Sequence, residues 1–387
     1  MTDYNNILSQ LEQSGNLRQL RNTRSEGKYI YHEGKRYLNL SSNDYLGVAC
    51  DGELQREFLA ALADATEFLF GSTSSRLLTG NAPSYTELEQ KLANLFGREA
   101  ALVFNSGYHA NIGVLPALTA KGDLILADKL VHASIIDGLR LCEAKWERYR
   151  HNDLEHLERL IIKNRDDYNR IIIVTESVFS MDGDIADLSA LCDLKEKYGA
   201  TLYVDEAHSF GAVGQHGLGL CEETNTTQRI DLIVGTFGKA IASQGAYLIA
   251  NREVVSYLIN TMRPLIFTTA LPPVNLHWTS FVIDALAEME NDRVKLVALG
   301  NLLRSELERV GVETRGCSHI VPVVAGENQE AIRLAELMQQ NGFWALPIRY
   351  PTVPKGEARI RISLNPQITE DEVAEIVKVA EQWKQNG

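Results

Sequence analysis

The chain is organised around the stretch Val234-Gly235-Thr236-Phe237-Gly238-Lys239-Ala240. The apolar residues at its start predict the end of a buried strand, and the small residues that follow predict a turn carrying one lysine. Burial lowers the pKa of an ammonium group, and only the neutral amine attacks a carbonyl carbon. The stretch therefore favours a Schiff-base lysine at the end of a strand, while a surface lysine in a turn is the ordinary alternative.

A second apolar run, Thr201–Val204, ends directly before Asp205. Pyridoxal phosphate needs an amine for its aldehyde and a carboxylate that keeps its ring nitrogen protonated, so that the ring can accept electrons. Lys239 suits the first role and Asp205 the second, and His208 suits a hydrogen bond to the phenolic oxygen. Open α/β sheets bind ligands at the carboxyl ends of their strands. The two strands together predict a pyridoxal phosphate site.

Short apolar runs alternate with helical patterns from about residue 51 to residue 255, which predicts an α/β fold with a mostly parallel, helix-covered sheet. Polar residues follow most of these runs, so we expect one site along a single edge of the sheet. The predicted strands are Ala101–Asn105, Leu124–Ala127, Ile171–Thr175, Thr201–Val204, Leu232–Gly235 and Ala246–Ala250, and the helices between them include Tyr85–Leu95, Leu154–Ile162 and Leu188–Tyr198.

The string Ser106-Gly107-Tyr108 stands at the start of a predicted helix. Glycine lets the backbone approach a ligand closely, and the N–H groups of a helix N-terminus bind phosphate. Tyr108 is suited to stacking on a flat ring, although Ser-Gly before a helix is often only a cap. Neither a P-loop motif nor an early G-x-G-x-x-G is present, which argues against nucleotide and dinucleotide folds.

The two ends of the chain have different patterns from the middle. Residues 4–14 predict a short amphipathic helix, and residues 29–40 predict a hairpin. Towards the C-terminus we expect a helix from about Val274 to Glu290, an extended segment over residues 348–354 and a strand containing Arg359 and Arg361. These two arginines form either a solvated strand face or a clamp for a carboxylate. We expect an N-terminal segment (1–48), a large domain (49–273) and a small α+β domain (274–387).

Composition limits the function further. The 387 residues carry a formal net charge of −13, which argues against binding to nucleic acid or to an anionic membrane. The five cysteines are scattered, so we expect no disulfide framework and no metal site. The first residues lack the pattern of a signal peptide, and no apolar run reaches transmembrane length, so we expect a cytoplasmic protein.

Taken together, the chain resembles the α-oxoamine synthase family of pyridoxal phosphate enzymes over nearly its whole length. That resemblance implies fold type I, with a seven-stranded sheet in the large domain, and an obligate homodimer with active sites at the subunit interface. It also implies condensation of an amino acid with an acyl thioester, with loss of carbon dioxide and of the thiol. The strings that carry it are Asn39–Gly47, Ser106-Gly107-Tyr108, His132-Ala133-Ser134, His151-Asn152-Asp153, Val178–Asp184, Val204–His208, Thr236–Lys239 and Pro351–Pro354.

The resemblance also implies roles for individual residues. Lys239 holds the cofactor and moves the substrate proton, Asp205 pairs with the ring nitrogen, His208 contacts the phenolic oxygen and His132 stacks on the ring. The remaining residues implied at the cofactor are Gly107, Tyr108, Ser180 and Thr236, with Thr268 and Thr269 reaching the phosphate of the neighbouring subunit. Those implied at the substrates are Asn43 and Arg361 for the amino acid carboxylate, and Arg21 and Thr352 for the acyl chain.

Several activities within this resemblance stay open. The wording of the motifs favours L-alanine with a pimeloyl thioester, carried by coenzyme A or by a carrier protein. The alternatives are glycine with acetyl- or succinyl-CoA, and serine with a long acyl-CoA. The residues Ala242-Ser243-Gln244 resemble those of family members that use this last pair. A fold-related aminotransferase is a further alternative. A non-catalytic partner subunit is disfavoured because Lys239 is present.

Overall fold

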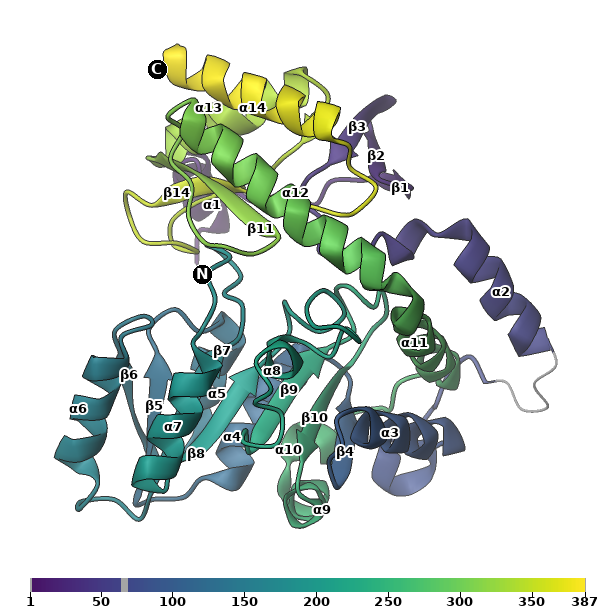
Figure 1. Ribbon diagram of the computed structural model, residues 1–387, viewed down its shortest axis with the longest axis vertical. Coiled ribbons are helices and arrows are strands. Elements are labelled where there is room, and N and C mark those ends of the chain that lie inside the picture. Colours follow the sequence, from purple (N-terminus) through teal and green to yellow (C-terminus); the bar gives the residue numbers. More distant parts are fainter. Residues whose placement is uncertain (1, 64–68, 387) are drawn as a thin grey trace. The chain divides into compact units, whose positions relative to one another are not determined.

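The computed structural model describes residues 2–63 and 69–386 and divides into two compact units (Figure 1). We call Asp51–Phe179 with Ile185–Arg293 the sheet unit, and Met1–Cys50 with Ser180–Asp184 and Val294–Gly387 the terminal unit. By this packing the N-terminal residues group with the C-terminal ones. The three-part division expected from the sequence stays a prediction.

The sheet unit is built on a seven-stranded sheet with the order β4-β10-β9-β8-β7-β5-β6. The pairs from β9 to β6 are parallel, and β10 is antiparallel to both of its neighbours. This confirms the α/β class and the mostly parallel sheet. The strands are β4 (Ala100–Phe104), β5 (Asp123–Asp128), β6 (Lys145–Tyr149), β7 (Arg170–Glu176), β8 (Thr201–Asp205), β9 (Leu232–Thr236) and β10 (Ala246–Ala250).

Strand β6 is the strand that the sequence did not predict. Its residues Lys145-Trp146-Glu147-Arg148-Tyr149 are mostly polar, because β6 lies at one edge of the sheet and only Tyr149 is buried. Every residue of β5, by contrast, is buried. Since neighbouring residues of a strand point to opposite faces, both faces of the sheet are covered there.

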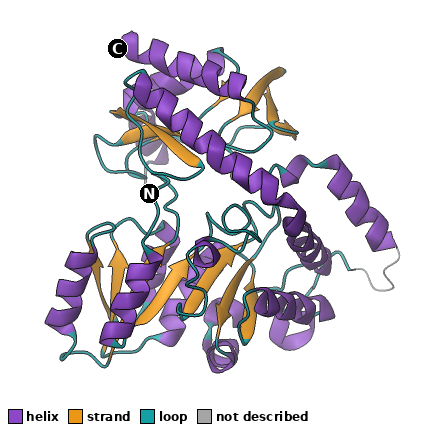
Figure 2. Ribbon diagram, viewed as in Figure 1, coloured by secondary structure: helices purple, strands orange, loops and turns teal. Residues whose placement is uncertain are grey.

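Helices surround the sheet (Figure 2). The helix predicted from about Val274 to Glu290 is present as an α-helix that ends at Ala285 and a 3-10 turn after it, and a further long helix begins at Glu290. The helices of this unit are α2 (Gly52–Ala63), α3 (Pro83–Leu95), α4 (Gly107–Leu118), α5 (Ala133–Leu141), α6 (Leu154–Asn164), α7 (Leu188–Tyr198), α8 (Leu220–Glu223), α9 (Arg252–Thr261), α10 (Arg263–Ile266) and α11 (Pro273–Ala285), with a π-helical turn at Arg76–Gly80 and a 3-10 turn at Leu286–Met289. Helix α12 (Glu290–Arg309) begins here and continues into the terminal unit.

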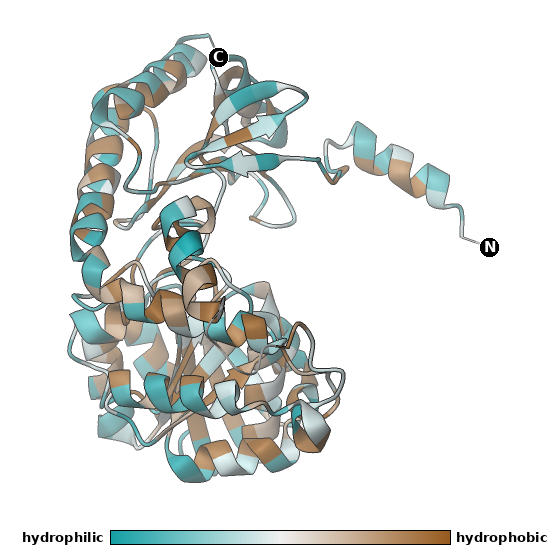
Figure 3. Cartoon of the chain, turned by 90° about the vertical axis from the view of Figure 1, so that its right-hand side faces the viewer, coloured by the Kyte–Doolittle hydropathy of each residue, from teal (hydrophilic) through white to brown (hydrophobic). Residues whose placement is uncertain are grey.

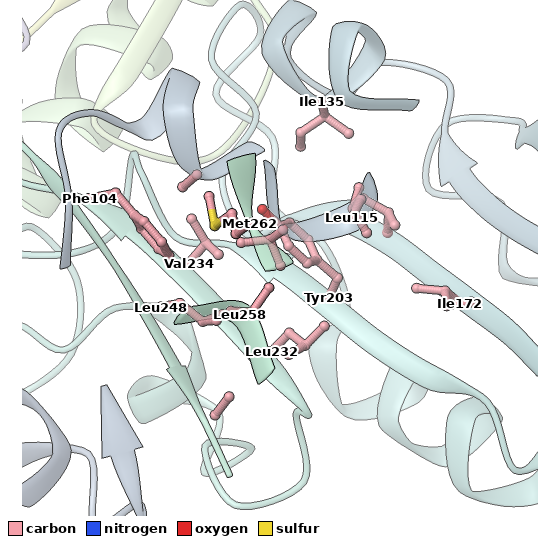
Figure 4. Packing of buried hydrophobic residues seen from close by; sticks show 14 of the residues in the cluster. Phe104, Leu115, Ile135, Ile172, Tyr203, Leu232, Val234, Leu248, Leu258 and Met262 are labelled. Carbon is pink, nitrogen blue, oxygen red and sulfur yellow. The ribbon is translucent and has the colours of Figure 1, made fainter. Parts of the chain in front are cut away.

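A continuous apolar core fixes the sheet against its helices. Figure 4 shows Phe104, Val234 and Leu248 from three adjacent strands, together with Met262, which follows α9. Burying such side chains stabilises the fold by about 1.5–3 kcal/mol each. Helices α4 and α5 pack closely because Gly138 carries no side chain. A Cβ atom there would lie 2.2 Å from the Asn111 carbonyl oxygen.

The terminal unit contains two smaller sheets. The predicted hairpin is confirmed as β2 (Tyr29–His32) and β3 (Lys35–Asn39), which extend into a sheet of order β1-β2-β3-β12. The second sheet has the order β11-β14-β13. The other elements are β1 (Arg24–Glu26), β11 (Ile320–Gly326), β12 (Phe343–Trp344), β13 (Pro347–Ile348), β14 (Ala358–Ser363), α13 (Asn328–Gln340), α14 (Glu370–Gln385) and a 3-10 turn at Val48–Cys50.

The predicted N-terminal helix is confirmed as α1 (Tyr4–Gln13), and it carries both hydrophobic and hydrophilic bands (Figure 3). The extended segment expected over residues 348–354 is partly wrong. Pro347 and Ile348 do form a strand, but the chain then turns, because the Thr352 N–H donates to the Arg349 carbonyl oxygen at 2.8 Å. Proline fixes φ at a value that turns also use, so it did not distinguish the two conformations.

The short segment Ser180–Asp184 belongs to the terminal unit although its neighbours in sequence lie in the sheet unit. Gly183 has a φ of +70°, and a Cβ atom there would lie 2.2 Å from the Ile320 carbonyl oxygen. Its own carbonyl oxygen accepts hydrogen bonds from the N–H groups of Cys317 and Ser318. Glycine is therefore required where this segment packs against the start of β11.

In the described residues, no helix combines the length and the apolar character needed to cross a bilayer.

Candidate active site

A cavity of about 180 Å³ lies at the carboxyl ends of three neighbouring parallel strands in the sheet unit. Glu176, Asp205 and Thr236 are the last residues of β7, β8 and β9, respectively. The structure thus brings together residues that are far apart in the sequence, as the strand-end pattern predicted. The cavity is lined by Gly107, Tyr108, Asn111, His132, Ser134, Glu176, Asp205, Ala207, His208, Thr236 and Lys239.

Lys239 lies in a tight loop that follows β9. The loop is closed by two hydrogen bonds at Phe237, whose N–H donates to the Gly245 carbonyl oxygen and whose carbonyl accepts from the Ser243 N–H. Phe237 itself is fully buried, so it anchors the loop in the core. Thr236 adds a donor–acceptor pair, because its hydroxyl donates to the Gly245 carbonyl and accepts from the Gly238 N–H. The lysine is therefore carried by a fixed backbone.

Asp205 is 5% exposed, and hydrogen bonds fix both of its carboxylate oxygens. Its Oδ1 accepts from the Ala207 N–H at 2.9 Å, and its Oδ2 accepts from Asn111 Nδ2 at 2.8 Å. His208 is also buried and lines the same cavity. An oriented carboxylate in a buried site suits the protonated ring nitrogen of pyridoxal phosphate.

His132 caps the N-terminus of α5, and its backbone N–H donates to the Glu176 carboxylate. Burial lowers the pKa of the His132 imidazole, while the Asp205 charge opposes that shift. Burial and the neighbouring Asp205 charge raise the pKa of Glu176 well above its ordinary value. These opposite shifts favour the neutral forms of both groups, so Asp205 is left as the carboxylate suited to a cationic ring.

The first turn of α4 also lines the cavity. Its residues Gly107 and Tyr108 present backbone N–H groups that have no partner within the helix, as at any helix N-terminus. A Cβ atom at Gly107 would lie 3.6 Å from Thr236 Cβ, so a side chain there would fill part of the space between them. Tyr108 is half-exposed, and its hydroxyl donates to Asp137 at 3.1 Å.

This set of groups fits pyridoxal phosphate. The described lining of the cavity offers the Lys239 amine, the oriented Asp205 carboxylate, the imidazoles of His132 and His208, and the N–H groups of a helix N-terminus. These match the aldehyde, the ring nitrogen, the ring face and the phosphate of the cofactor. The sequence assigns no individual role to Asn111, Ser134 or Glu176, although Glu176 directly follows a predicted strand and Ser134 belongs to the string His132-Ala133-Ser134. Asn111 follows Gly107 by one helical turn, which is the signal that could have placed it on the same face of α4.

A second group of predicted site residues lies in the terminal unit. Arg361 donates from Nη2 to Asn43 Oδ1 at 2.6 Å and from Nη1 to the Ser180 carbonyl oxygen at 3.1 Å. The Tyr45 hydroxyl also donates to Asn43 Oδ1, at 3.0 Å. Since the Asn43 oxygen accepts both bonds, its amide nitrogen is the end that can donate to a carboxylate. In the described residues, no carboxylate forms an ion pair with Arg361.

Arg359, two residues earlier on β14, is bound quite differently. It is 1% exposed and forms ion pairs with Asp182 and with Glu357. The solvated strand face that the alternation of β14 allowed is therefore wrong for Arg359. The segment Ser180–Asp184 brings an acidic partner from elsewhere in the chain, which local alternation could not reveal.

Arg21 and Thr352 lie along the N-terminal part of the terminal unit. The Arg21 guanidinium stacks over the Trp344 ring at 5.5 Å, and the Thr352 hydroxyl accepts from Arg18 Nη2 at 3.1 Å. Thr352 lines a groove of about 620 Å³ and Arg21 lines one of about 650 Å³, and Arg18 and Arg349 line both. Burial and the charges of Arg18 and Arg21 lower the pKa of Arg349. The sequence missed Arg18 and Arg349 as members of this cationic group.

Three residues expected at the cofactor are not among the described residues that line the cavity. Ser180 belongs to the terminal unit. Thr268 and Thr269 follow α10, and the Thr269 carbonyl oxygen accepts from Asn105 Nδ2 at 2.7 Å. The roles of these three residues stay predictions.

Comparison with known proteins gives the family. The family profile described as aminotransferase class I and II matches residues 35–379. The 8-amino-7-oxononanoate synthase of Haemophilus ducreyi is 52% identical over 380 residues, covering 96% of this chain and 98% of that protein. A serine palmitoyltransferase structure from S. paucimobilis, with a bound PLP–myriocin aldimine, has a TM-score of 0.90 at 28% identity and covers 99% of this chain and 97% of its own. An 8-amino-7-oxononanoate synthase structure from Francisella tularensis has a TM-score of 0.76 at 28% identity, covering 90% of this chain and 98% of its own. The chain therefore belongs to the class I and II aminotransferase family and, within it, to the α-oxoamine synthases, which are pyridoxal phosphate enzymes of fold type I.

Proposed function

We propose that this pyridoxal phosphate-dependent acyltransferase condenses L-alanine with a pimeloyl thioester of coenzyme A or a carrier protein. The products are 8-amino-7-oxononanoate, carbon dioxide and the free thiol, and the reaction is a step of biotin biosynthesis. The observation that carries the proposal is 52% identity over nearly the full length to a synthase of that name. The cavity supports it with groups that match the aldehyde, the ring nitrogen, the ring face and the phosphate of the cofactor.

Pyridoxal phosphate, when bound, supplies an aldehyde and a ring that accepts electrons. Lys239 is the amine that would hold the aldehyde, and its neutral form would take the Cα proton of the amino acid. Asp205 would hold the proton on the ring nitrogen. His132 would cover one face of the ring, and the N–H groups at Gly107 and Tyr108 would bind the phosphate.

The substrate roles rest on uncompensated positive charge. Among the described residues, Arg361 bonds to two neutral acceptors, Asn43 and the Ser180 carbonyl, so its charge is available to the carboxylate of alanine. Arg21 lies beside Arg18 and Arg349, and this group suits the distal carboxylate of a pimeloyl chain. A fatty acyl chain has no such carboxylate.

Condensation of L-serine with a long acyl-CoA is the second candidate, because the serine palmitoyltransferase structure has a higher TM-score than the 8-amino-7-oxononanoate synthase structure. The residues Ala242-Ser243-Gln244 resemble those of serine palmitoyltransferase-like proteins, but they support this candidate less than the sequence suggested. The Ser243 hydroxyl lies 2.7 Å from the Thr279 hydroxyl, and Asn275 Nδ2 donates to the Gln244 carbonyl oxygen. These residues therefore serve the packing of α11 against the lysine loop.

The homodimer, the roles of Thr268 and Thr269 at the neighbouring subunit and the cytoplasmic location stay predictions. The dimer has one further argument. Several large apolar side chains of the sheet unit are exposed, among them Phe70, Leu78 and Phe267. Exposed apolar groups of this kind are typical of surfaces that another chain covers.

A substrate panel tests the function. L-Alanine, glycine and L-serine are each combined with pimeloyl-, acetyl-, succinyl- and palmitoyl-CoA, and thiol release is measured. We expect L-alanine with pimeloyl-CoA to give the highest kcat/KM, and the Lys239→Ala variant to release no thiol above background. A preference for L-serine with palmitoyl-CoA would replace the proposal with the second candidate. Borohydride treatment of the wild-type protein, followed by digestion, should leave a pyridoxyl group on Lys239, and its presence on another lysine would refute the site.

A further inference from the structure

The buried polar groups around the cavity form one continuous hydrogen-bonded chain between Asp205 and His132. Asn111 Nδ2 donates to Asp205 Oδ2 at 2.8 Å and to Ser134 Oγ at 2.9 Å. Ser134 Oγ lies 2.7 Å from His132 Nδ1. Asn111 and Ser134 are 2% and 1% exposed, respectively, so water does not compete for these bonds.

The orientation of the Asn111 amide follows from its neighbours. An ionised carboxylate only accepts hydrogen bonds, so the Asn111 nitrogen, and not its oxygen, must face Asp205. The Asn111 oxygen then accepts from the hydroxyl of Tyr203. Burial and the Asp205 charge raise the pKa of Tyr203 well above its ordinary value, so its hydroxyl remains a donor. Both hydrogens of the amide are therefore committed, one to Asp205 and one to Ser134.

The proton of the Ser134 hydroxyl is fixed in turn. Because Ser134 Oγ accepts from Asn111, its own hydrogen is directed to its other side-chain neighbour at hydrogen-bond distance, His132 Nδ1. The Ser134 backbone N–H also donates to His132 Nδ1, at 3.3 Å. Two donors converge on one ring nitrogen, which must then carry a lone pair and no proton.

We propose that Asn111 and Ser134 are positioning residues that hold His132 as the neutral tautomer with its proton on Nε2. The inference deepens the proposed function and rests on it, since it concerns the same cavity. A neutral imidazole adds no positive charge against a cationic cofactor ring, so it does not oppose the protonated nitrogen that Asp205 stabilises. The Nε2–H is then a hydrogen-bond donor available to an oxygen of the substrate.

The close packing of α4 against α5 makes the relay possible. Asn111 lies on α4 and Ser134 lies at the start of α5. Gly138, one turn after Ser134, meets the backbone at Asn111, where any side chain would collide with the Asn111 carbonyl oxygen. The glycine therefore sets the distance that the amide of Asn111 spans.

The test is nuclear magnetic resonance of the full-length protein with ¹⁵N in its histidine rings, recorded both with the cofactor and without it. The chain has nine histidines, and the His132 signals are those lost in a His132→Asn variant. We expect wild-type His132 to show a protonated Nε2 and an unprotonated Nδ1 at pH 7. An Nδ1-protonated or a doubly protonated ring would overturn the proposal.

Variants separate positioning from simple structural support. Ser134→Ala should lower the ratio of the Nε2–H to the Nδ1–H tautomer about fivefold, the effect of one net hydrogen bond. Asn111→Ala should shift the ratio in the same direction but less, because it acts through Ser134. Ser134→Thr, which keeps the hydroxyl, should retain the wild-type ratio.

Asn164→Ala is the matched control, because Asn164 is also buried in the sheet unit but donates to the Leu160 carbonyl oxygen. It should leave the His132 signals unchanged. An unchanged ratio in Ser134→Ala, or an equal shift in Ser134→Thr, would overturn the proposal. The ring-nitrogen signals do not depend on turnover, so a failed substrate panel and a failed tautomer assignment are distinguishable.

Discussion

The cavity of the sheet unit and the arginines of the terminal unit differ in how far their charged groups are paired within the protein. In the cavity, Asp205 is held on both oxygens by donors from its own unit, and burial favours the neutral forms of His132 and Glu176. In the terminal unit, Arg361 and Arg21 have no carboxylate among their described partners. A fixed, internally satisfied site suits a group that stays bound, whereas uncompensated charge suits an anion that arrives and leaves.

The terminal unit also contains its own contrast. Arg359 and Arg361 stand two residues apart on β14, yet Arg359 pairs with Asp182 and Glu357 while Arg361 bonds to an amide and a carbonyl oxygen. The same residue type therefore stabilises the fold at one position and remains available for a ligand at the other. The difference arises from which segments pack against each side chain.

Asp205→Asn tests the cavity and should give the largest effect. An amide cannot hold a proton on the ring nitrogen, so we expect kcat to fall by at least about a hundredfold while the cofactor is still bound. Steady-state kinetics and the absorbance of the bound cofactor measure the two quantities separately. Near-normal kcat would remove the role given to Asp205.

Arg359→Met tests the structural arginine. Removing one partner of a buried ion pair leaves the other charge uncompensated, and we expect a loss of about 3 kcal/mol in the free energy of unfolding. Urea denaturation of the full chain measures it, with Arg361→Met as the matched control that should lose much less. Equal losses in both variants would mean that the contrast between the two arginines has no energetic basis.

Arg361→Met also tests whether this arginine binds the amino acid substrate. A lost charge-assisted hydrogen bond should raise the KM for the amino acid by roughly ten- to a hundredfold. The KM for the acyl thioester should change little. Arg361→Lys should recover only part of the loss, because an ammonium lacks the planar fork of a guanidinium. An unchanged KM for the amino acid in Arg361→Met would place its carboxylate elsewhere.

Arg21→Ala should give the smallest effect, because Arg18 and Arg349 remain beside the same grooves. We expect the KM for pimeloyl-CoA to rise roughly five- to tenfold, and the KM for a neutral acyl-CoA of equal length to stay within about twofold. The comparison of the two thioesters is the control. An equal rise for both would show that Arg21 contacts a part that the substrates share.

The sequence was enough to predict the α/β class, six of the seven strands of the large sheet, Asp205 at the end of β8 and Lys239 in the loop after β9. It could do so because apolar runs of a buried parallel sheet are continuous, and because the charged residues that follow two such runs match the needs of one cofactor. It missed β6, whose polar residues at the sheet edge lack that signal.

The partners of the charged and polar groups depend on tertiary packing, which local sequence patterns do not reveal. Asn111 and Ser134 look like ordinary helix residues in the sequence, and they reach Asp205 and His132 only because α4 and α5 pack closely at Gly138. Arg359 and Arg361 are equivalent by local alternation, and they differ because Asp182 and Glu357 pair with Arg359, whereas Arg361 meets the Asn43 amide and the Ser180 carbonyl. Local periodicity specifies which face a side chain occupies, whereas its partners come from segments that are distant in the sequence, and it is those partners that set its charge and its role.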